Sequence, residues 1–359
     1  MNSFDYIRPA TVAEAIAAAA EPGSAFLAAG TNLIDMMKTG ALRPDRLVDL
    51  THLPGLSDVE WLSDGGVRIG ALVRNADLAH DPEFASRFPA VAEALLAGAS
   101  AQLRNAATVG GNLMQRTRCR HFADPASACN RRVPGSGCDA IGGETRGCAI
   151  LGHSEACVAT HPSDFCVPLA ALDAVVEIAG ATGAREVPLE DFHLLPGDRP
   201  MMETMLEPGD LITGLRLAGD AVRFSAHSRY LKLRDRTSYA FALVSAAACL
   251  TIEAGEITAA RIALGGVAAK PWRAKAAERV LIGAAPGPEP FWRAAEAALE
   301  DARPVSGPDG GSGGDNAFKI ALAGRIFTRA LKAAAAGTPA RVPALPGSVH
   351  VANGDPAHA

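Results

Sequence analysis

Six of the seven cysteines in this 359-residue chain lie between Cys119 and Cys166, and this clustering constrains the fold more than any other feature. The stretch is rich in Arg, Gly, Pro, Asp and Ser and shows no apolar period. Cysteines that pack in a core lie in apolar surroundings instead. The stretch therefore predicts a polar loop whose cysteines do not serve to pack a core.

The composition is that of a globular protein, with 48% hydrophobic and 20% charged residues and a net charge of -5. The length suffices for two or three domains, each with its own core. An odd number of cysteines in a chain of this size favours metal ligation in a reducing compartment over a disulfide framework. The lack of a basic run excludes nucleic acid as a partner, and no apolar stretch predicts a membrane span or a signal peptide.

Short strands and helices alternate in the first part of the chain. Thr11 and Glu14 form a capping box, which predicts a helix over 12–20 after a short strand at 4–9. The next elements follow from apolar periodicity and turn residues. They are a strand at 25–30, a helix at 33–38, strands at 47–50 and 66–71, a helical turn capped by Asn75 and a helix at 89–98.

Two small-residue turns stand out. Gly30, Thr31 and Asn32 join a predicted strand to a helix start, a geometry that presents backbone N–H groups to a phosphate. Close packing of the strand against the helix is the alternative. Thr108 to Asn112 contains two adjacent glycines that can turn the backbone while offering amides outward, or form a plain turn. The unit around Gly30 lacks the spaced glycines of a dinucleotide-binding fingerprint, so NAD binding is not predicted from it.

The pattern changes near Arg223, where a compact α+β domain is predicted. Between the last two helices, residues 306–315 have the composition of a flexible loop, and the tail after Gly337 is predicted to be extended. The elements expected in this domain are strands at 224–233, 250–253 and 257–264, and helices at 238–249, 290–302 and 316–335.

Two segments carry a resemblance to a known family. Leu27-Ala-Ala-Gly-Thr-Asn-Leu33 and Thr108-Val-Gly-Gly-Asn112 resemble the paired pyrophosphate-binding turns in the FAD-binding subunit of the molybdenum hydroxylases, the group of xanthine dehydrogenase, aldehyde oxidoreductase and carbon monoxide dehydrogenase. Ala29 and Asn32 depart from the glycine and the aspartate that many members have. Further segments resemble motifs of this family and follow one another in the same order along the chain, at 160–164, 168–173, 230–234 and 261–267.

The resemblance implies an α+β fold with a two-lobed, vanillyl-alcohol-oxidase-like FAD-binding domain and a small C-terminal antiparallel sheet covered by helices. We expect the FAD-binding domain at 1–222, with lobes at about 1–55 and 56–222 and a loop insertion at about 115–160. The C-terminal domain is expected at 223–336 and the tail at 337–359. The implied FAD contacts are the diphosphate turns Leu27, Ala28, Ala29, Gly30, Thr31, Asn32, Leu33, Thr108, Val109, Gly110, Gly111 and Asn112, and, near the other parts of the cofactor, Asp164, Ile212 and Lys232.

Lys232 is expected to stabilise negative charge on the reduced flavin, and a solvated strand lysine is the alternative. The resemblance narrows to a subgroup, including 4-hydroxybenzoyl-CoA reductase and bacterial three-subunit aldehyde oxidoreductases, whose flavin subunit binds a [4Fe-4S] cluster in an inserted loop. Such a cluster takes four thiolates. The implied ligands are Cys119, Cys129, Cys138 and Cys157.

Cys148 is the alternative fourth ligand, but the apolar residues that follow it favour a packing role. Cys166 and Cys249 lie in apolar periodic surroundings and are interpreted as core residues, and His153 and His161 as ordinary loop histidines. Zinc is the rival metal, although the paired two-residue spacing of zinc knuckles is absent. The arginines of the loop, among them Arg131 and Arg132, would offset cluster charge or face an acidic partner.

The family resemblance implies an oxidoreductase subunit that relays electrons. A large molybdenum-cofactor subunit would oxidise an aldehyde or heterocycle, and a small subunit with two [2Fe-2S] clusters would pass electrons to this chain's FAD and then to an external acceptor. A standalone flavin oxidase of a small alcohol or amine, and a zinc-stabilised binding module, are the alternatives. Iron–sulfur assembly implies folding in the cytoplasm, with export to the periplasm inside a complex as a second possibility.

Overall fold

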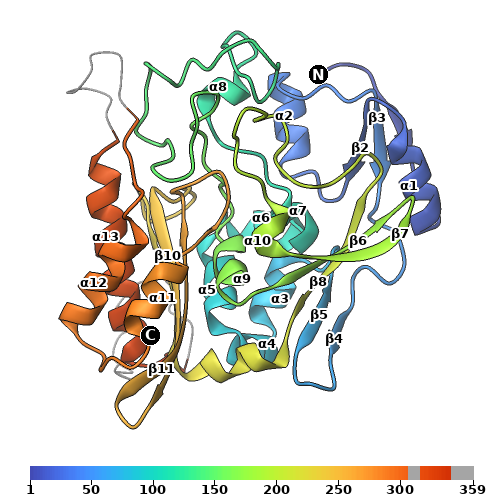
Figure 1. The fold of residues 1–359 in the computed structure, drawn as a ribbon. Helices are drawn as coiled ribbons and strands as arrows, with labels where there is room; N and C mark the ends of the chain where they lie inside the picture. Colours follow the sequence, from blue (N-terminus) through green and yellow to red (C-terminus); the bar gives the residue numbers. More distant parts are fainter. Residues whose placement is uncertain (306–315, 341–359) are drawn as a thin grey trace.

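The computed structural model describes residues 1–305 and 316–340. The chain begins with a small lobe built on a parallel three-stranded sheet of order β1-β3-β2, which Figure 1 shows in blue beside helix α1. Helix α1 begins as predicted, because the Thr11 side chain accepts the Glu14 N–H at 3.2 Å. The elements of this lobe are β1 (Asp5–Ile7), α1 (Val12–Ala20), β2 (Ser24–Leu27), α2 (Leu33–Thr39) and β3 (Arg46–Asp49).

The second lobe is an antiparallel five-stranded sheet of order β4-β5-β8-β6-β7 with short helices packed against it. Its strands are β4 (Val59–Trp61), β5 (Val67–Gly70), β6 (Val175–Gly180), β7 (Gly183–Pro188) and β8 (Leu211–Leu217). Its helices are α3 (Asn75–His80), α4 (Pro82–Arg87), α5 (Pro89–Ala97), α6 (Ala101–Ala106), α7 (Val109–Leu113), α9 (Cys166–Ala171) and α10 (Leu189–Phe192).

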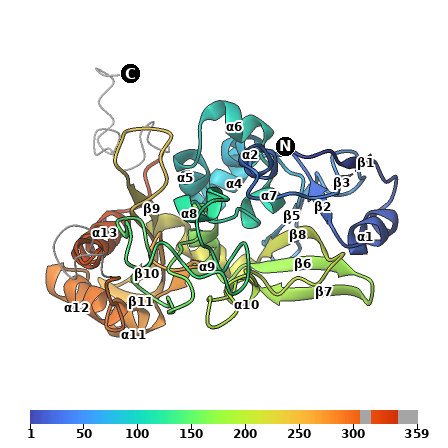
Figure 2. The same cartoon turned by 90° about the horizontal axis from the view of Figure 1, so that it is seen from above.

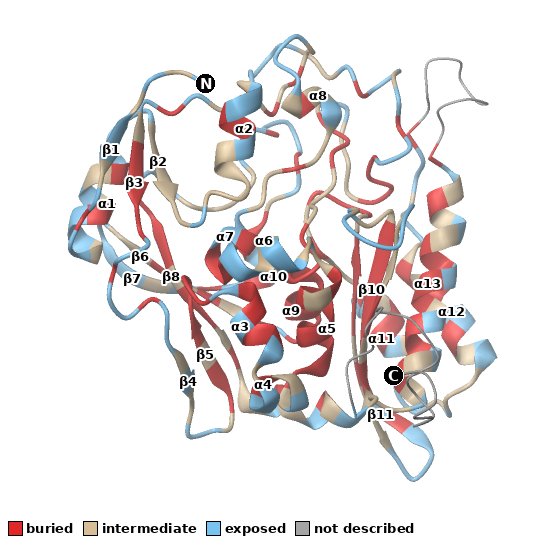
Figure 3. Ribbon diagram, turned by 180° about the vertical axis from the view of Figure 1, so that it is seen from behind, coloured by how far each residue is buried: buried red, intermediate tan, exposed pale blue. Residues whose placement is uncertain are grey.

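The C-terminal domain is an antiparallel sheet of order β12-β11-β10-β9 with three helices. Helices α11 to α13 cover one face of this sheet, while the other face is turned toward α5 and α9 (Figures 1 and 3). Helix α5 is buried almost all round, as expected for a helix enclosed between two sheets. The elements of the domain are a 3-10 helix (Gly219–His227), β9 (Ser228–Leu233), β10 (Val244–Glu253), β11 (Glu256–Gly265), β12 (Trp272–Arg273), α11 (Lys275–Leu281), α12 (Pro288–Ala298) and α13 (Phe318–Ala335).

The helix predicted over 238–249 is wrong, because this segment enters the central strand β10. Ala247 and Cys249 of β10 belong to the core shared with the second lobe, whereas Ala246 and Ala248 belong to the core under α13. A strand buried on both faces has no polar alternation, and its alanines leave room for helices on either side. An alanine-rich apolar run of this kind cannot be distinguished from a helix by periodicity.

Several smaller predictions also need correction. Asn75 is the first residue of α3 rather than its cap, a position that Arg74 takes, and residues 224–227 form the end of the 3-10 helix rather than a strand. Helix α11 was not predicted. The predicted flexible loop at 306–315 and most of the predicted tail lie outside the described residues. The predicted domain limits at 55, 115, 160 and 222 stay predictions.

The cysteine loop, residues 114–162, contains only the short helix α8 (Arg120–Ala123). Side chains organise the rest: Arg132 donates to the carbonyls of His121 at 2.7 Å and Phe122 at 2.6 Å, and Asn130 Nδ2 donates to the Ala156 carbonyl at 3.1 Å. Figure 2 shows the loop as a green trace lying between the C-terminal domain and the helices of the second lobe. The loop is therefore a fixed part of the structure at the junction of the domains.

Candidate functional site

A cleft of about 910 Å³ opens between the first lobe, the helices of the second lobe, the cysteine loop and the C-terminal domain. Of the residues predicted to contact FAD, six line this cleft: Thr31, Asn32, Gly111, Asn112, Asp164 and Lys232. They come from the turn before α2, from α7, from β9 and from the segment before α9, which are far apart in the sequence. The fold therefore brings the two predicted turns and the Asp164 block to one place.

The first turn leaves a run of backbone donors unused. Between Ala28 and Leu33, no backbone N–H donates a hydrogen bond to any described residue, although carbonyls of the same turn accept bonds from α2. Gly30 has a φ of +72°, and a Cβ placed there would lie 2.8 Å from Ile34, so glycine is required. Consecutive unpaired N–H groups at a strand-to-helix turn are the arrangement that binds a diphosphate.

The second turn is built differently from the prediction that its amides face outward. Within α7 and its cap, Val109 and Gly110 donate to the carbonyls of Val73 and Ala71 at 2.9 and 2.8 Å, and Gly111 donates to Thr108 Oγ1 at 3.2 Å. Gly110 is needed because a Cβ would lie 2.9 Å from Ala71. The turn therefore contributes the exposed face of Gly111 and the Asn112 side chain to the cleft rather than free amides.

Asp164 and Lys232 form a buried ion pair at the cleft wall. Lys232 Nζ lies 2.7 Å from Asp164 Oδ2, with the two side chains 2% and 7% exposed, and it also donates to the Ala97 carbonyl at 3.2 Å. The Tyr230 hydroxyl donates to Asp164 Oδ1 at 2.5 Å, and burial together with this carboxylate raises the pKa of Tyr230 well above 10. Lys232 is therefore not a solvated strand lysine, and Tyr230 is a member of the site that sequence reasoning missed.

The remaining predicted FAD contacts are not among the residues that line the cleft. Ile212 pairs with Ile178 in the sheet of the second lobe and is 6% exposed within its core, so it does not line the cleft in the described chain. Its register places it on a buried sheet face, which its position in the sequence alone did not reveal. The other predicted contacts that do not line the cleft are Leu27, Ala28, Ala29, Gly30, Leu33, Thr108, Val109 and Gly110.

Five cysteines of the loop converge beside the cleft, and Cys119 and Cys148 line it. Burial raises the pKa of the Cys119 and Cys138 thiols, and neighbouring thiols of the group raise both further. Backbone N–H groups act in the opposite direction, from Phe122 and His121 toward Cys119 and from Ala140 and Ile141 toward Cys138. N–H groups that face sulfur are the surroundings that thiolate ligands of a metal centre need.

The two candidates for the fourth ligand have different surroundings. The Cys157 sulfur accepts from Arg131 Nη2 at 3.7 Å, and Arg131 is in turn paired with Glu203 at 3.1 Å. Burial raises the pKa of Cys148 to about 12, and its thiol lies 4.0 Å from the Glu144 carbonyl. Cys148 also packs with Ala140, Val158 and Val305. A guanidinium thus faces the Cys157 sulfur, whereas Cys148 lies among apolar side chains and the Cys119 and Cys138 thiols.

The sulfur spacing bears on which metal the loop suits. A single tetrahedral zinc ion with Zn–S bonds of about 2.3 Å holds its ligand sulfurs roughly 3.8 Å apart. Within the described chain, the group of three or more metal-ligand atoms that lie within 4.8 Å of one another is His161, Cys166 and His193, and none of the five loop cysteines belongs to it. No three sulfurs of the described loop cysteines therefore lie as close together as a single zinc ion would hold them.

Five arginines of the described loop form ion pairs. Arg116 and Arg131 both contact Glu203, which follows α10 in the chain, and Arg118 pairs with Asp35 at 2.8 Å. His153 bonds to the Arg303 carbonyl at 3.1 Å, which fits its interpretation as an ordinary loop residue. Glu203 was not predicted as part of the site, because it is 87 residues from Arg116 and no motif marks it.

Comparison with known proteins agrees with this architecture. The family described as the FAD binding domain in molybdopterin dehydrogenase matches residues 2–217, and the CO dehydrogenase flavoprotein C-terminal domain matches residues 229–334. This chain therefore belongs to the FAD-binding medium subunits of the molybdenum hydroxylases. It is a flavin-binding oxidoreductase subunit, which confirms the predicted family, fold, cofactor FAD and enzyme class.

Two relatives show how far the similarity extends. The aldehyde oxidoreductase FAD-binding subunit PaoB of Escherichia coli K12 is 44% identical over 338 residues, which are 94% of this chain and 99% of that protein. The carbon monoxide dehydrogenase medium chain of Afipia carboxidovorans is 28% identical over 93% of this chain and 98% of its own length. Both names describe subunits of larger enzymes, which favours a relay subunit over a standalone oxidase.

Solved structures give the same result. The structure of reconstituted CO dehydrogenase from Oligotropha carboxidovorans superposes with a TM-score of 0.73 at 27% identity, covering 94% of this chain and 99% of that one. Quinoline 2-oxidoreductase from Pseudomonas putida 86 gives a TM-score of 0.69 at 26% identity, with coverages of 93% and 97%. In the part of this chain that the structure describes, no helix is both long and apolar enough to cross a bilayer.

Proposed function

We propose that this chain is an electron-transfer subunit that holds FAD in the cleft and a [4Fe-4S] cluster in the cysteine loop. It receives electrons from a partner subunit with two [2Fe-2S] clusters, which are reduced in turn by a molybdenum-cofactor subunit, and delivers them to an external acceptor. One observation carries the proposal: Cys119, from the cysteine loop, and Thr31, Asn32 and Lys232, from the predicted flavin site, line the same cleft.

The residues of the cleft fit FAD. The unpaired N–H groups from Ala28 to Leu33 suit the diphosphate, and the buried Nδ2 of Asn32, which has no partner among the described residues, supplies a further donor. FAD, when bound, supplies a centre that takes up two electrons and exchanges them singly with iron–sulfur clusters. Lys232 provides a fixed positive charge at the cleft wall, and Asp164 with Tyr230 hold that charge in place.

The proposed cluster ligands are Cys119, Cys129, Cys138 and Cys157, with Cys148 as the alternative to Cys157. The chain's own contribution is to direct N–H groups at Cys119 and Cys138 and the Arg131 guanidinium at Cys157. Donors to ligand sulfurs and nearby positive charge raise the reduction potential of such a cluster. Because iron–sulfur clusters are inserted in the cytoplasm, we place the assembly of this subunit there, with later export inside a complex as the second route.

Absorption spectroscopy of the purified chain tests the proposal. After anaerobic reconstitution with iron and sulfide, we expect flavin bands on a broad iron–sulfur shoulder, with four irons and one FAD per chain. Flavin bands without bound iron would refute the cluster and leave the flavin site intact. A colourless protein would refute both parts of the proposal.

Single cysteine variants decide the fourth ligand. Electron paramagnetic resonance of the reduced protein should lose the cluster signal in Cys157→Ser and retain it in Cys148→Ser. Cys249→Ser is the matched control, because Cys249 is a buried thiol that belongs to the β10 core and lies outside the loop. Loss of the signal in Cys148→Ser alone would overturn the assignment to Cys157.

A further inference from the structure

Three side chains on the far side of the flavin cleft wall form a second cluster of metal-binding atoms. His161 lies at the end of the cysteine loop, Cys166 is the first residue of α9, and His193 directly follows α10. One ligand atom from each residue lies within 4.8 Å of the other two. We call this group the His-Cys-His site. It is separate from the five loop cysteines, and the function proposed above does not use it.

Both imidazoles present an unused nitrogen. His193 Nε2 lies 2.9 Å from the Leu113 carbonyl, so Nε2 carries the proton and Nδ1 carries the lone pair. His193 is 2% exposed, and its buried Nδ1 has no partner among the described residues. A histidine that binds a metal characteristically donates its other N–H to a backbone carbonyl in this way. His193 is therefore oriented and protonated as a metal ligand would be.

His161 offers a free lone pair on its unpartnered nitrogen only in one of its two tautomers. Its Nδ1 accepts a long bond of 3.4 Å from the Ser163 backbone N–H, and its buried Nε2 has no hydrogen-bond partner in the described chain. Moving the proton from Nε2 to Nδ1 frees Nε2 as a ligand, and it replaces the bond from Ser163 by a contact between two N–H donors, from which the imidazole must turn away. Burial lowers the pKa of both histidines, that of His193 to about 4, so both are neutral at physiological pH.

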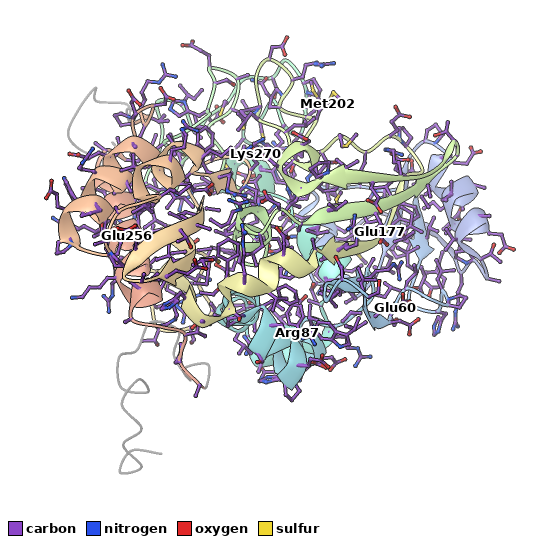
Figure 4. The ribbon with its side chains drawn as sticks, turned by 60° about the horizontal axis from the view of Figure 1, so that its bottom comes forward. Glu60, Arg87, Glu177, Met202, Glu256 and Lys270 are labelled. Atoms are coloured by element: carbon purple, nitrogen blue, oxygen red, sulfur yellow. The ribbon has the colours of Figure 1, made fainter. Side chains whose placement is uncertain are left out.

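The third donor and an entry path are also present. Cys166 is a free thiol with 0% exposure, and burial raises its pKa to about 12, so it is protonated until a cation displaces the proton. His161 and His193 line a second cavity of about 270 Å³, together with Met202 and Glu203. Figure 4 labels Met202 at the outer edge of the molecule and Lys270 nearer its centre. The cavity gives an ion access to the two imidazoles.

We propose that His161 Nε2, His193 Nδ1 and Cys166 Sγ bind one zinc ion, with the fourth position facing the 270 Å³ cavity. Two nitrogens and one sulfur are a donor set that zinc favours, with an open fourth position for water. Bonds of about 2.0 Å to nitrogen and 2.3 Å to sulfur require ligand atoms roughly 3.3–3.6 Å apart. Binding therefore needs the ligand atoms to approach one another by at most about 1.5 Å, and it releases the Cys166 proton to solvent.

The site is connected to the flavin cleft through a short hydrogen-bond chain. The Cys166 N–H donates to Ser163 Oγ at 3.3 Å, and Ser163 Oγ donates to Asn112 Oδ1 at 2.7 Å. Asp164, the partner of Lys232, lies in the same segment between His161 and Cys166. A zinc ion would fix both ends of this segment, so we infer that it holds Asp164 and Asn112 in position for the cofactor.

Cobalt(II), a spectroscopic substitute for zinc, tests the site in the full-length FAD-loaded chain under anaerobic conditions. The wild-type protein is compared with His193→Gln, in which the amide nitrogen replaces Nε2 toward Leu113 and no atom replaces Nδ1. Cys166→Ser removes the thiolate, and Cys249→Ser is the control because Cys249 is equally buried and has a comparable hydroxyl neighbour in Ser228 at 3.3 Å. All four proteins keep the loop cysteines, so cobalt bound there cancels in difference spectra.

We expect His193→Gln and Cys166→Ser to bind one cobalt fewer per chain than wild type and to lack its thiolate-to-cobalt absorption. Cys249→Ser should match wild type, and added zinc should abolish the difference spectrum. Zinc should also raise the Tm of wild type more than that of His193→Gln. Equal cobalt content and spectra in wild type, His193→Gln and Cys166→Ser would overturn the proposal. If Cys166→Ser fails to fold, the His193→Gln comparison decides alone.

Discussion

The buried pair between Lys232 and Asp164 makes a quantitative prediction. Lys232→Met removes the ammonium group but leaves the Asp164 carboxylate, 7% exposed, with the Tyr230 hydroxyl as its remaining side-chain partner in the described chain. Removing one member of a buried ion pair typically costs about 3–5 kcal/mol, because the other charge stays buried without compensation. We expect urea unfolding of the FAD-free protein to show a loss of stability of this size.

A double-mutant cycle separates the charge effect from lost packing. Asp164→Asn keeps an oxygen for the Tyr230 hydroxyl but removes the charge, so the double variant has no uncompensated buried charge. Its loss in free energy of unfolding should therefore be smaller than the sum of the losses in the two single variants. Lys275→Met is the control, because its ion pair with Glu190 is surface-exposed and worth less than about 1 kcal/mol. If the loss in the double variant equals the sum of the two single losses to within roughly 0.5 kcal/mol, the coupling inferred from the 2.7 Å contact is refuted.

Four further substitutions probe the second turn, the α1 cap and a buried lysine. Gly110→Ala should lower the free energy of unfolding in urea by about 1–3 kcal/mol, because its Cβ would meet Ala71 at 2.9 Å. Gly111→Ala should chiefly weaken FAD binding, which a flavin fluorescence titration measures. Thr11→Ala should lower the free energy of unfolding by about 0.5–2 kcal/mol through loss of the α1 cap. Burial lowers the pKa of Lys319 from 10.5 to about 8, so the unfolded chain binds more protons between these pH values. Stability should therefore rise from pH 8 to pH 10.5 in wild type more than in Lys319→Met, and parallel pH profiles would contradict this.

Local patterns predicted the parts of the fold that depend on neighbours in sequence. The capping box gave the start of α1, and the Gly30 turn between β2 and α2 lies where the small residues indicated. The same reasoning failed at β10, because whether an alanine-rich run is a helix or a strand depends on what packs on its two faces. Those partners, α13 on one side and the second-lobe core on the other, come from distant parts of the chain.

In the candidate site, too, local sequence predicts some features while others depend on tertiary packing. The residue types of both turns were recognised, but only hydrogen-bond partners distinguish the unused amides near Gly30 from the satisfied amides of Val109 and Gly110. The Asp164–Lys232 pair joins residues 68 positions apart, and Tyr230 enters the site because its strand β9 borders the cleft. Such contacts follow from tertiary packing and leave no local pattern in the sequence.

The C-terminal domain explains how the cysteine loop keeps its place against the cleft. Lys319 of α13 is fully buried and donates to the carbonyls of Cys148 at 2.6 Å and Gly266 at 2.8 Å, and Asn316 donates to the Cys148 and Ala149 carbonyls at 3.0 and 3.2 Å. These bonds fasten the loop to β11 and to the start of α13. Cys148 and Cys119 line the same cleft as the predicted flavin contacts, so these bonds also hold part of the cleft wall in place. The C-terminal domain thus supports the cleft in two ways, through these bonds to the loop and through Lys232 of β9.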